Sequence, residues 1–130
     1  MYLNKFLFIA ALLGFTAVAI GAMGAHALKP ILSEAQLQSF ETGVKYHFYH
    51  SLLLLIIVFW NESKNISKLK WASYLIIAGI ICFSGSIYIL STAHLYSTSG
   101  LKFLGPITPI GGLLLMTGWI FIALSAFNKK

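Results

Sequence analysis

The chain contains 130 residues, of which 58% are hydrophobic and 9% are charged, and its mean hydropathy is +0.85. A soluble domain carries about 25% charged residues, so this composition excludes an ordinary soluble protein and indicates an integral membrane protein. The net charge of +6 arises from nine lysines and three glutamates. Because the lysines flank apolar runs, we expect them to contact membrane lipids and to set the topology, and we expect no nucleic-acid partner.

The first apolar run, residues 6–28, is uncharged and long enough to cross a bilayer as a helix. Lys5 before the run, and the small residues Ala25 and Ala27 near its end, are also typical of a signal peptide. The apolar core of a signal peptide has about 7 to 15 residues, so the longer run favours a retained transmembrane helix.

A second helix is predicted to start after Pro30, because Ser33 and Gln36 have the spacing of a capping box. Residues 34–45 are amphipathic at helical spacing and lead into a second span at about residues 40–60. This part of the chain therefore predicts an interfacial helical stretch followed by a membrane crossing.

Two further spans are predicted at about residues 71–90 and 108–127, separated by a loop at residues 91–102. Thr108 is the expected N-cap of the last helix, because Pro109 is tolerated at a first helical position. The sequence thus predicts an all-α membrane protein with four transmembrane helices in one bundle, forming a single membrane domain over residues 1–130.

The distribution of lysines predicts the orientation of this bundle. Six lysines would lie on the side of both termini and three on the other side: Lys5, Lys64, Lys68, Lys70, Lys129 and Lys130 against Lys29, Lys45 and Lys102. Because cytoplasmic loops carry the excess of lysine, both termini are expected inside the cell, in a multi-pass protein of the cytoplasmic membrane.

Glycines recur on the predicted helices at spacings that let two backbones approach closely. In lipid, such contact is a main force of helix association, and we expect the glycines to serve packing within the bundle rather than a dimer interface. The candidate packing residues are Gly14, Gly21, Gly24, Gly85, Gly111 and Gly112.

Polar residues gather toward the predicted non-cytoplasmic ends of the spans. One hypothesis is an outward-facing pocket that binds a metal, haem, a quinone or a lipid headgroup; its candidate residues are His26, Glu41, Tyr46, His50 and Thr108. The alternative, which we favour for metal binding, is that they are interfacial residues that bond helix ends and headgroups. Too few ligands converge for a persuasive metal site, so neither a metal site nor a cofactor is predicted.

The segments GAMGAHAL (21–28), FETGVKYHFYHSLLLL (40–55), FSGSIYIL (83–90) and LGPITPIGGLLLMTGW (104–119) resemble the YgdD/YwdK family of small bacterial membrane proteins of unassigned function. The resemblance covers nearly the whole chain and implies four membrane-spanning helices. Among the polar residues, it points to His26, Glu41, Tyr46, His50, Ser86 and Thr108. His47 stands where the family pattern usually has glutamine, which argues against an obligatory metal ligand there.

No catalytic motif is recognised, so we expect a non-enzymatic membrane protein that acts through lipid contact or through association with other membrane proteins or with its own copies. The alternative is a cofactor-binding protein that uses His26, Tyr46 and His50 for haem, a metal or a quinone. A transporter or channel is disfavoured on the expectation that no ionisable residue lies at mid-membrane depth.

Overall fold

A computed structural model describes residues 2–96 and 101–127, and every regular element in those residues is helical. Four of the helices are long and apolar enough to cross a membrane. The prediction of an all-helical chain with four long apolar helices packed together is therefore confirmed.

Helix α1 (Tyr2–Met23) continues without a break into a π-helical turn, η1 (Gly24–Leu28). The chain then reverses, because the amide groups of Ile31 and Leu32 both donate to the carbonyl of Leu28, at 3.0 and 2.9 Å. Together α1 and η1 cover the first predicted span and extend it toward the N-terminus.

Helix α2 (Glu34–Lys64) is a single helix of 31 residues, so the amphipathic stretch and the second predicted span form one continuous element. The predicted capping box is confirmed: the Ser33 hydroxyl accepts from the Gln36 amide at 3.3 Å, and the Gln36 side chain accepts from the Ser33 amide at 2.9 Å. The helix ends at Asn65, which adopts a left-handed conformation with φ 46°.

Helix α3 (Ser67–Thr92) passes into a short 3-10 turn, η2 (Ala93–Leu95), and a second turn, η3 (Leu101–Leu104), precedes α4 (Ile107–Ser125). Part of the predicted loop at 91–102 is thus helical, and residues 97–100 lie outside the described part. The prediction that Thr108 caps α4 is wrong, because Pro106 already has a helical φ of −65° and the helix begins at Ile107.

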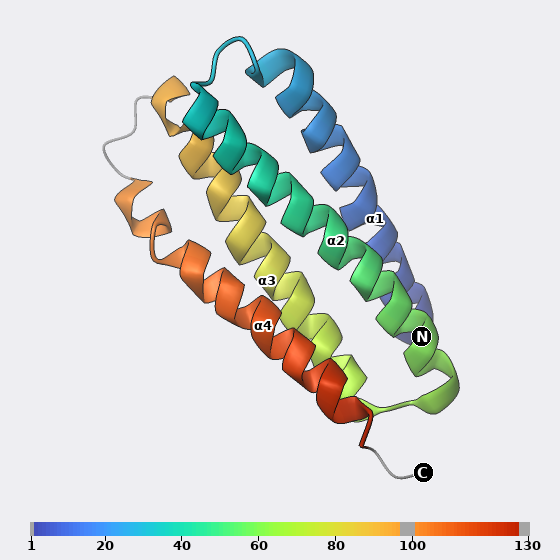
Figure 1. The fold of residues 1–130 in the computed structure, drawn as a ribbon. Helices are drawn as coiled ribbons and strands as arrows, with labels where there is room; N and C mark the ends of the chain where they lie inside the picture. The colour runs from blue at the N-terminus through green and yellow to red at the C-terminus, as the bar shows by residue number, and fades with distance from the viewer. Residues whose placement is uncertain (1, 97–100, 128–130) are drawn as a thin grey trace.

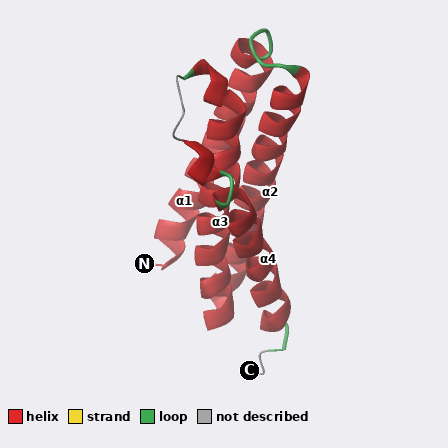
Figure 2. Cartoon of the chain, turned by 90° about the vertical axis from the view of Figure 1, so that its left-hand side faces the viewer, coloured by secondary structure: helices red, strands yellow, loops and turns green. Residues whose placement is uncertain are grey.

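The four long helices lie in chain order, with α1 packed on α2, α2 on α3 and α3 on α4 (Figure 1). The connecting segments lie at the ends of the helices (Figure 2). α1 begins and α4 ends at the same end of the molecule as the α2–α3 turn (Figure 1). We call this end the terminal end and the opposite one the α1–α2 end.

The core lies between the helices and is built from small and branched apolar side chains, among them Ala10, Leu54, Ile57 and Ile76, each at most 1% exposed. Large apolar side chains also cover the outside of the molecule: Phe8 is 69% and Phe15 is 70% exposed. Such a surface suits a solvent of acyl chains, in which exposed apolar groups carry no penalty.

Candidate functional site

Two buried histidines lie near the middle of α2. His50 follows Glu34 by 16 residues and precedes Lys64 by 14, and His47 lies one turn away on the same helix. Their side chains are only 5% (His47) and 6% (His50) exposed. Both positions lie well inside α2, which starts six residues before the predicted span at residues 40–60.

His50 is held by two hydrogen bonds that use both ring nitrogens. Its Nδ1 lies 2.8 Å from the backbone carbonyl of Tyr46, and its Nε2 lies 3.3 Å from the indole Nε1 of Trp119 on α4. A carbonyl only accepts and an indole N–H only donates, so Nδ1 carries the proton and Nε2 is the acceptor. The ring is therefore neutral, and its lone pair is directed at Trp119.

His47 forms the opposite tautomer. Its Nδ1 lies 3.1 Å from the hydroxyl oxygen of Tyr88 on α3, and its Nε2 lies 3.5 Å from the hydroxyl oxygen of Thr16 on α1. The Thr16 hydroxyl donates to the Leu12 carbonyl at 2.9 Å, so its oxygen is left to accept from His47 Nε2. The Tyr88 hydroxyl then donates to Nδ1.

The two histidines together connect all four helices. From α2, His47 reaches α1 through Thr16 and α3 through Tyr88, and His50 reaches α4 through Trp119. Buried polar groups in a bilayer need partners inside the protein, and here each ring has one on either side. This arrangement satisfies both buried rings and fixes the mutual position of the four helices.

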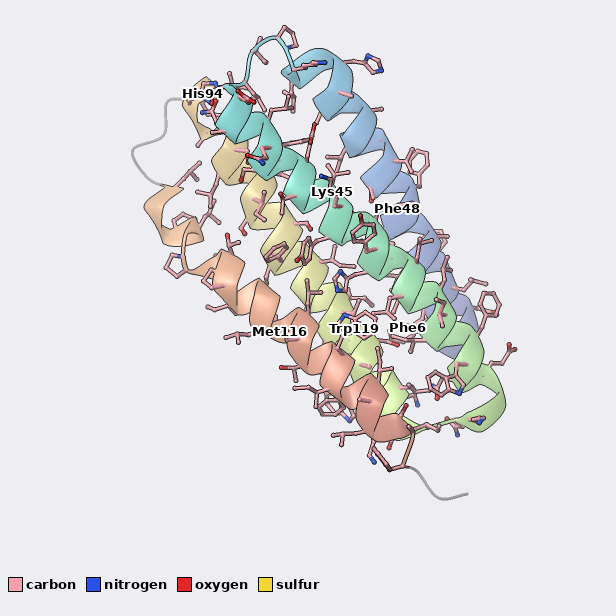
Figure 3. All side chains as sticks on the ribbon, in the orientation of Figure 1. Phe6, Lys45, Phe48, His94, Met116 and Trp119 are labelled. Carbon is pink, nitrogen blue, oxygen red and sulfur yellow. The ribbon has the colours of Figure 1, made fainter. Side chains whose placement is uncertain are left out.

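A groove opens beside His50 between α2, α3 and α4. Its volume is about 310 Å³, and it is lined by Tyr46, His50, Phe83, Gly112, Leu115, Met116 and Trp119. The Tyr46 ring stacks on His50 with 5.9 Å between centroids and lies 4.8 Å from the Phe83 ring. Met116 and Trp119 lie on α4 (Figure 3) and are 56% and 52% exposed, so the groove faces the surroundings of the protein.

The other residues of the predicted pocket lie outside this groove. His26 and Glu41 are exposed, and the Thr108 hydroxyl lies 2.6 Å from that of Ser86, joining α4 to α3. His26 follows Thr16 by ten residues on α1 and η1, which is about 15 Å along the helix axis. Since Thr16 contacts His47, His26 lies well beyond the level of His47. The structure thus brings Tyr46 and His50 together and leaves His26 apart.

The described part of the chain does not bring His26 and His50 together as ligands of one metal ion. Among the described residues, no group of three or more His, Cys, Asp or Glu side chains is close enough to hold a metal ion. The lone pair of His50 is occupied by Trp119, and the acceptor nitrogen of His47 by Tyr88. A metal would have to displace an interhelical hydrogen bond to bind either ring.

The glycines of the predicted packing set fall into three groups. A Cβ on Gly24 would lie 2.8 Å from Phe40 and one on Gly21 would lie 3.1 Å from Val44, so α1 and η1 approach α2 closely there. A Cβ on Gly111 would overlap the backbone nitrogen of Phe83, so the backbones of α4 and α3 approach closely there.

The second group makes ordinary contacts, at 4.0 Å for Gly14 and 3.7 Å for Gly112. Gly85 forms the third, because a Cβ there would meet nothing within 4 Å. Contrary to expectation, Gly85 makes no close helix contact within the described chain.

The hydrogen-bond partners of the two buried histidines were not singled out from the sequence: Thr16, Tyr88 and Trp119. Thr16 is a single hydroxyl within an apolar run, and Trp119 and Tyr88 resemble ordinary interfacial aromatic residues. Their role depends on which helices are neighbours, which the sequence pattern does not specify.

Four apolar helices tied by buried polar contacts define a multi-pass helical membrane protein. The chain belongs to the family described as protein of unknown function (DUF423), whose model matches residues 20–112. The predicted resemblance to the family that includes YwdK is thereby confirmed.

Individual relatives match over nearly the full length. The chain is 43% identical over 126 residues to a UPF0382 membrane protein of Staphylococcus aureus (strain bovine RF122 / ET3-1), covering 97% of this chain and 98% of that protein. It is 38% identical over 125 residues to the UPF0382 membrane protein YwdK of Bacillus subtilis, covering 95% and 97%. A UPF0382 membrane protein of Haemophilus influenzae is 38% identical over 128 residues, covering 98% and 97%. No solved structure matches the chain.

Proposed function

We propose that this protein is a non-enzymatic membrane protein that acts through its lipid-facing helices, by contacting lipids or by associating with other membrane proteins or further copies of itself. The observation that carries the proposal is the hydrogen bonding of His47 and His50. All four ring nitrogens have a partner inside the protein, three on a neighbouring helix and one, the Tyr46 carbonyl, on α2 itself, so these buried polar groups stabilise the bundle. A catalytic base or metal ligand needs a free nitrogen that points to a substrate or an ion.

The outer surface supports the same proposal. Exposed apolar side chains lie on every long helix, including Phe15 at 70%, Ile56 at 62%, Ile81 at 62% and Leu113 at 59%. Helix faces of this kind contact acyl chains directly and are also the faces through which membrane proteins associate.

We further propose that both termini lie in the cytoplasm. Lys5, Lys64, Lys68 and Lys70 lie at or near the terminal end, where α1 begins and the α2–α3 turn is found (Figure 1). An excess of lysine marks the cytoplasmic side of short loops. Reporter fusions at each terminus test this: activity of a cytoplasmic reporter at both ends is expected, and activity of a periplasmic reporter at either end would contradict it.

The function is tested by purification in a mild detergent that preserves bound lipid, with photo-crosslinking groups placed at Phe15 and Ile81. Crosslinks to lipid or to a membrane protein are expected from these exposed positions. Tightly held haem, metal or quinone at one equivalent per chain would overturn the proposal.

A second candidate function is the binding of a flat ring ligand such as a quinone. It is favoured by the groove of about 310 Å³ in which Tyr46, His50 and Trp119 meet, because aromatic walls suit a planar ring. Organic extraction of the purified protein distinguishes the two: a quinone recovered from the wild type and absent from Tyr46→Ala would favour this second candidate.

A further inference from the structure

A second groove runs along the outside of α1 and α2, near the α1–α2 end. Its volume is about 240 Å³, and its lining residues are Ala17, Val18, Gly21, Val44, Lys45, Phe48 and Tyr49. Val18 is 61% and Tyr49 is 60% exposed, so the groove opens to the surroundings of the helices. Except for the Lys45 ammonium and the Tyr49 hydroxyl, its side chains are apolar, which suits an acyl chain.

Lys45 places a positive charge at this apolar groove. It is exposed, lies on α2 (Figure 3), and forms no ion pair with any residue that the structure describes. Side chains of a helix lean toward its N-terminus, so the ammonium group is directed toward the α1–α2 end. The long methylene chain of a lysine lets its charge extend along the helix from an apolar surface toward the lipid headgroups.

Glu41 lies one turn further toward the α1–α2 end on the same face of α2. It is also exposed and without an ionic partner among the described residues. The distance along the axis between the two positions is about 6 Å. From the centre of the molecule outward, the surface therefore presents an apolar groove, then a cation, and then an anion.

An aminophospholipid has the complementary order: acyl chains, then a phosphate, then a protonated amine. We propose that this face of α1 and α2 binds phosphatidylethanolamine, with an acyl chain in the groove, the phosphate on Lys45 and the amine on Glu41. A phosphatidylglycerol would also reach Lys45 with its phosphate, but it offers Glu41 no cation. The selectivity thus resides in Glu41 and the affinity in Lys45.

This inference specifies the lipid for the lipid contact proposed above, and it rests on that proposed function. The test is native mass spectrometry of the full chain, purified in mild detergent and equilibrated with equal amounts of phosphatidylethanolamine and phosphatidylglycerol that carry the same acyl chains. We expect the wild type to retain about five times as much phosphatidylethanolamine as phosphatidylglycerol, because a single charge contact near a membrane surface has an effect of this size.

Four variants separate the parts of the site. Lys45→Gln lowers retention of both lipids, Glu41→Gln removes the preference between them, and Val18→Trp fills the groove and lowers retention of both. Lys29→Gln is the matched control, because Lys29 is an exposed lysine in the turn at the same end. It leaves retention and preference unchanged. Circular dichroism of each variant checks that the helices are intact.

Equal retention of the two lipids by the wild type would overturn the inference, as would a preference that Glu41→Gln leaves intact. A dimer mass that disappears in Lys45→Gln would assign the groove to a second copy of the chain and would also overturn it. In each case lipid or a protein is still bound, so the proposed function stands. A chain that retains neither but holds a stoichiometric cofactor would contradict the proposed function itself.

Discussion

The indole N–H of Trp119 donates to Nε2 of His50 across 3.3 Å, joining two helices whose contact residues are 69 positions apart in the chain. The other nitrogen of the ring is fixed at 2.8 Å from the Tyr46 carbonyl, so the imidazole has a single orientation. Helix α4 packs mainly on α3, and this hydrogen bond holds it to α2 as well. This hydrogen bond therefore connects α2 and α4 across the groove that His50 and Trp119 line.

Replacing Trp119 by phenylalanine keeps an aromatic ring on α4 but removes the donor to His50. We expect the free energy of unfolding to fall by about 1 kcal/mol, the usual value of an interhelical hydrogen bond in a membrane protein. Unfolding in mixed micelles by increasing SDS, followed by circular dichroism, measures this.

Trp71→Phe is the matched control for this variant, because Trp71 is 59% exposed at the start of α3. We expect it to leave the unfolding curve nearly unchanged. An equal loss in both variants would mean that ring size, and not the bond to His50, accounts for the effect.

His47→Gln and His47→Leu differ in whether they retain hydrogen bonding. Leucine would leave the hydroxyl of Tyr88 without its partner at 3.1 Å and would remove the contact to Thr16. We expect this variant to lose about 1 to 2 kcal/mol in the free energy of unfolding. Glutamine has both a donor and an acceptor, so it should retain most of the stability.

The same SDS titration tests the His47 pair. If both variants were as stable as the wild type, the hydrogen bonds of His47 would contribute nothing measurable. If glutamine instead cost as much stability as leucine, the imidazole itself would be required.

The helices could be predicted from the sequence because their causes are local. An uncharged run such as residues 6–28 has only one stable form in lipid, a helix that satisfies its own backbone groups. The capping box of Ser33 and Gln36 likewise involves residues three positions apart. Neither prediction needs knowledge of the neighbouring helices.

The site could be predicted only in part, because it depends on helix neighbours and on their relative rotation. Tyr46 and His50 are one turn apart on α2, so their contact follows from helical spacing. The partner Trp119 does not, since it is brought in by α4. His26 was grouped with His50 on the expectation that both lie toward the same end of the spans, whereas His50 lies near the middle of α2, which runs from Glu34 to Lys64.

Gly111→Ala should separate α3 from α4. The added Cβ would overlap the backbone of Phe83, and neither backbone can move without losing contacts along the helix pair. Overpacking of this kind costs about 1 to 3 kcal/mol, so we expect the SDS midpoint to fall.

Gly85→Ala is the matched control on α3, because a Cβ there meets nothing within 4 Å. Alanine favours the helix over glycine by about 0.5 to 1 kcal/mol, so this variant should be slightly more stable than the wild type. Destabilisation by Gly85→Ala would indicate that another molecule packs against this glycine.

The end of α2 depends on the left-handed backbone of Asn65, with φ 46° and ψ 49°. Its amide donates to the Asn61 carbonyl at 2.8 Å, and the Asn61 side chain accepts from the Ile66 amide at 2.6 Å, which starts α3. Asn65→Gly should preserve this turn, whereas Asn65→Val should cost about 1 to 2 kcal/mol, because a β-branched residue is strained at positive φ. The SDS unfolding midpoints of the two variants measure the difference. If valine were tolerated as well as glycine, the conformation of Asn65 would not be what ends the helix.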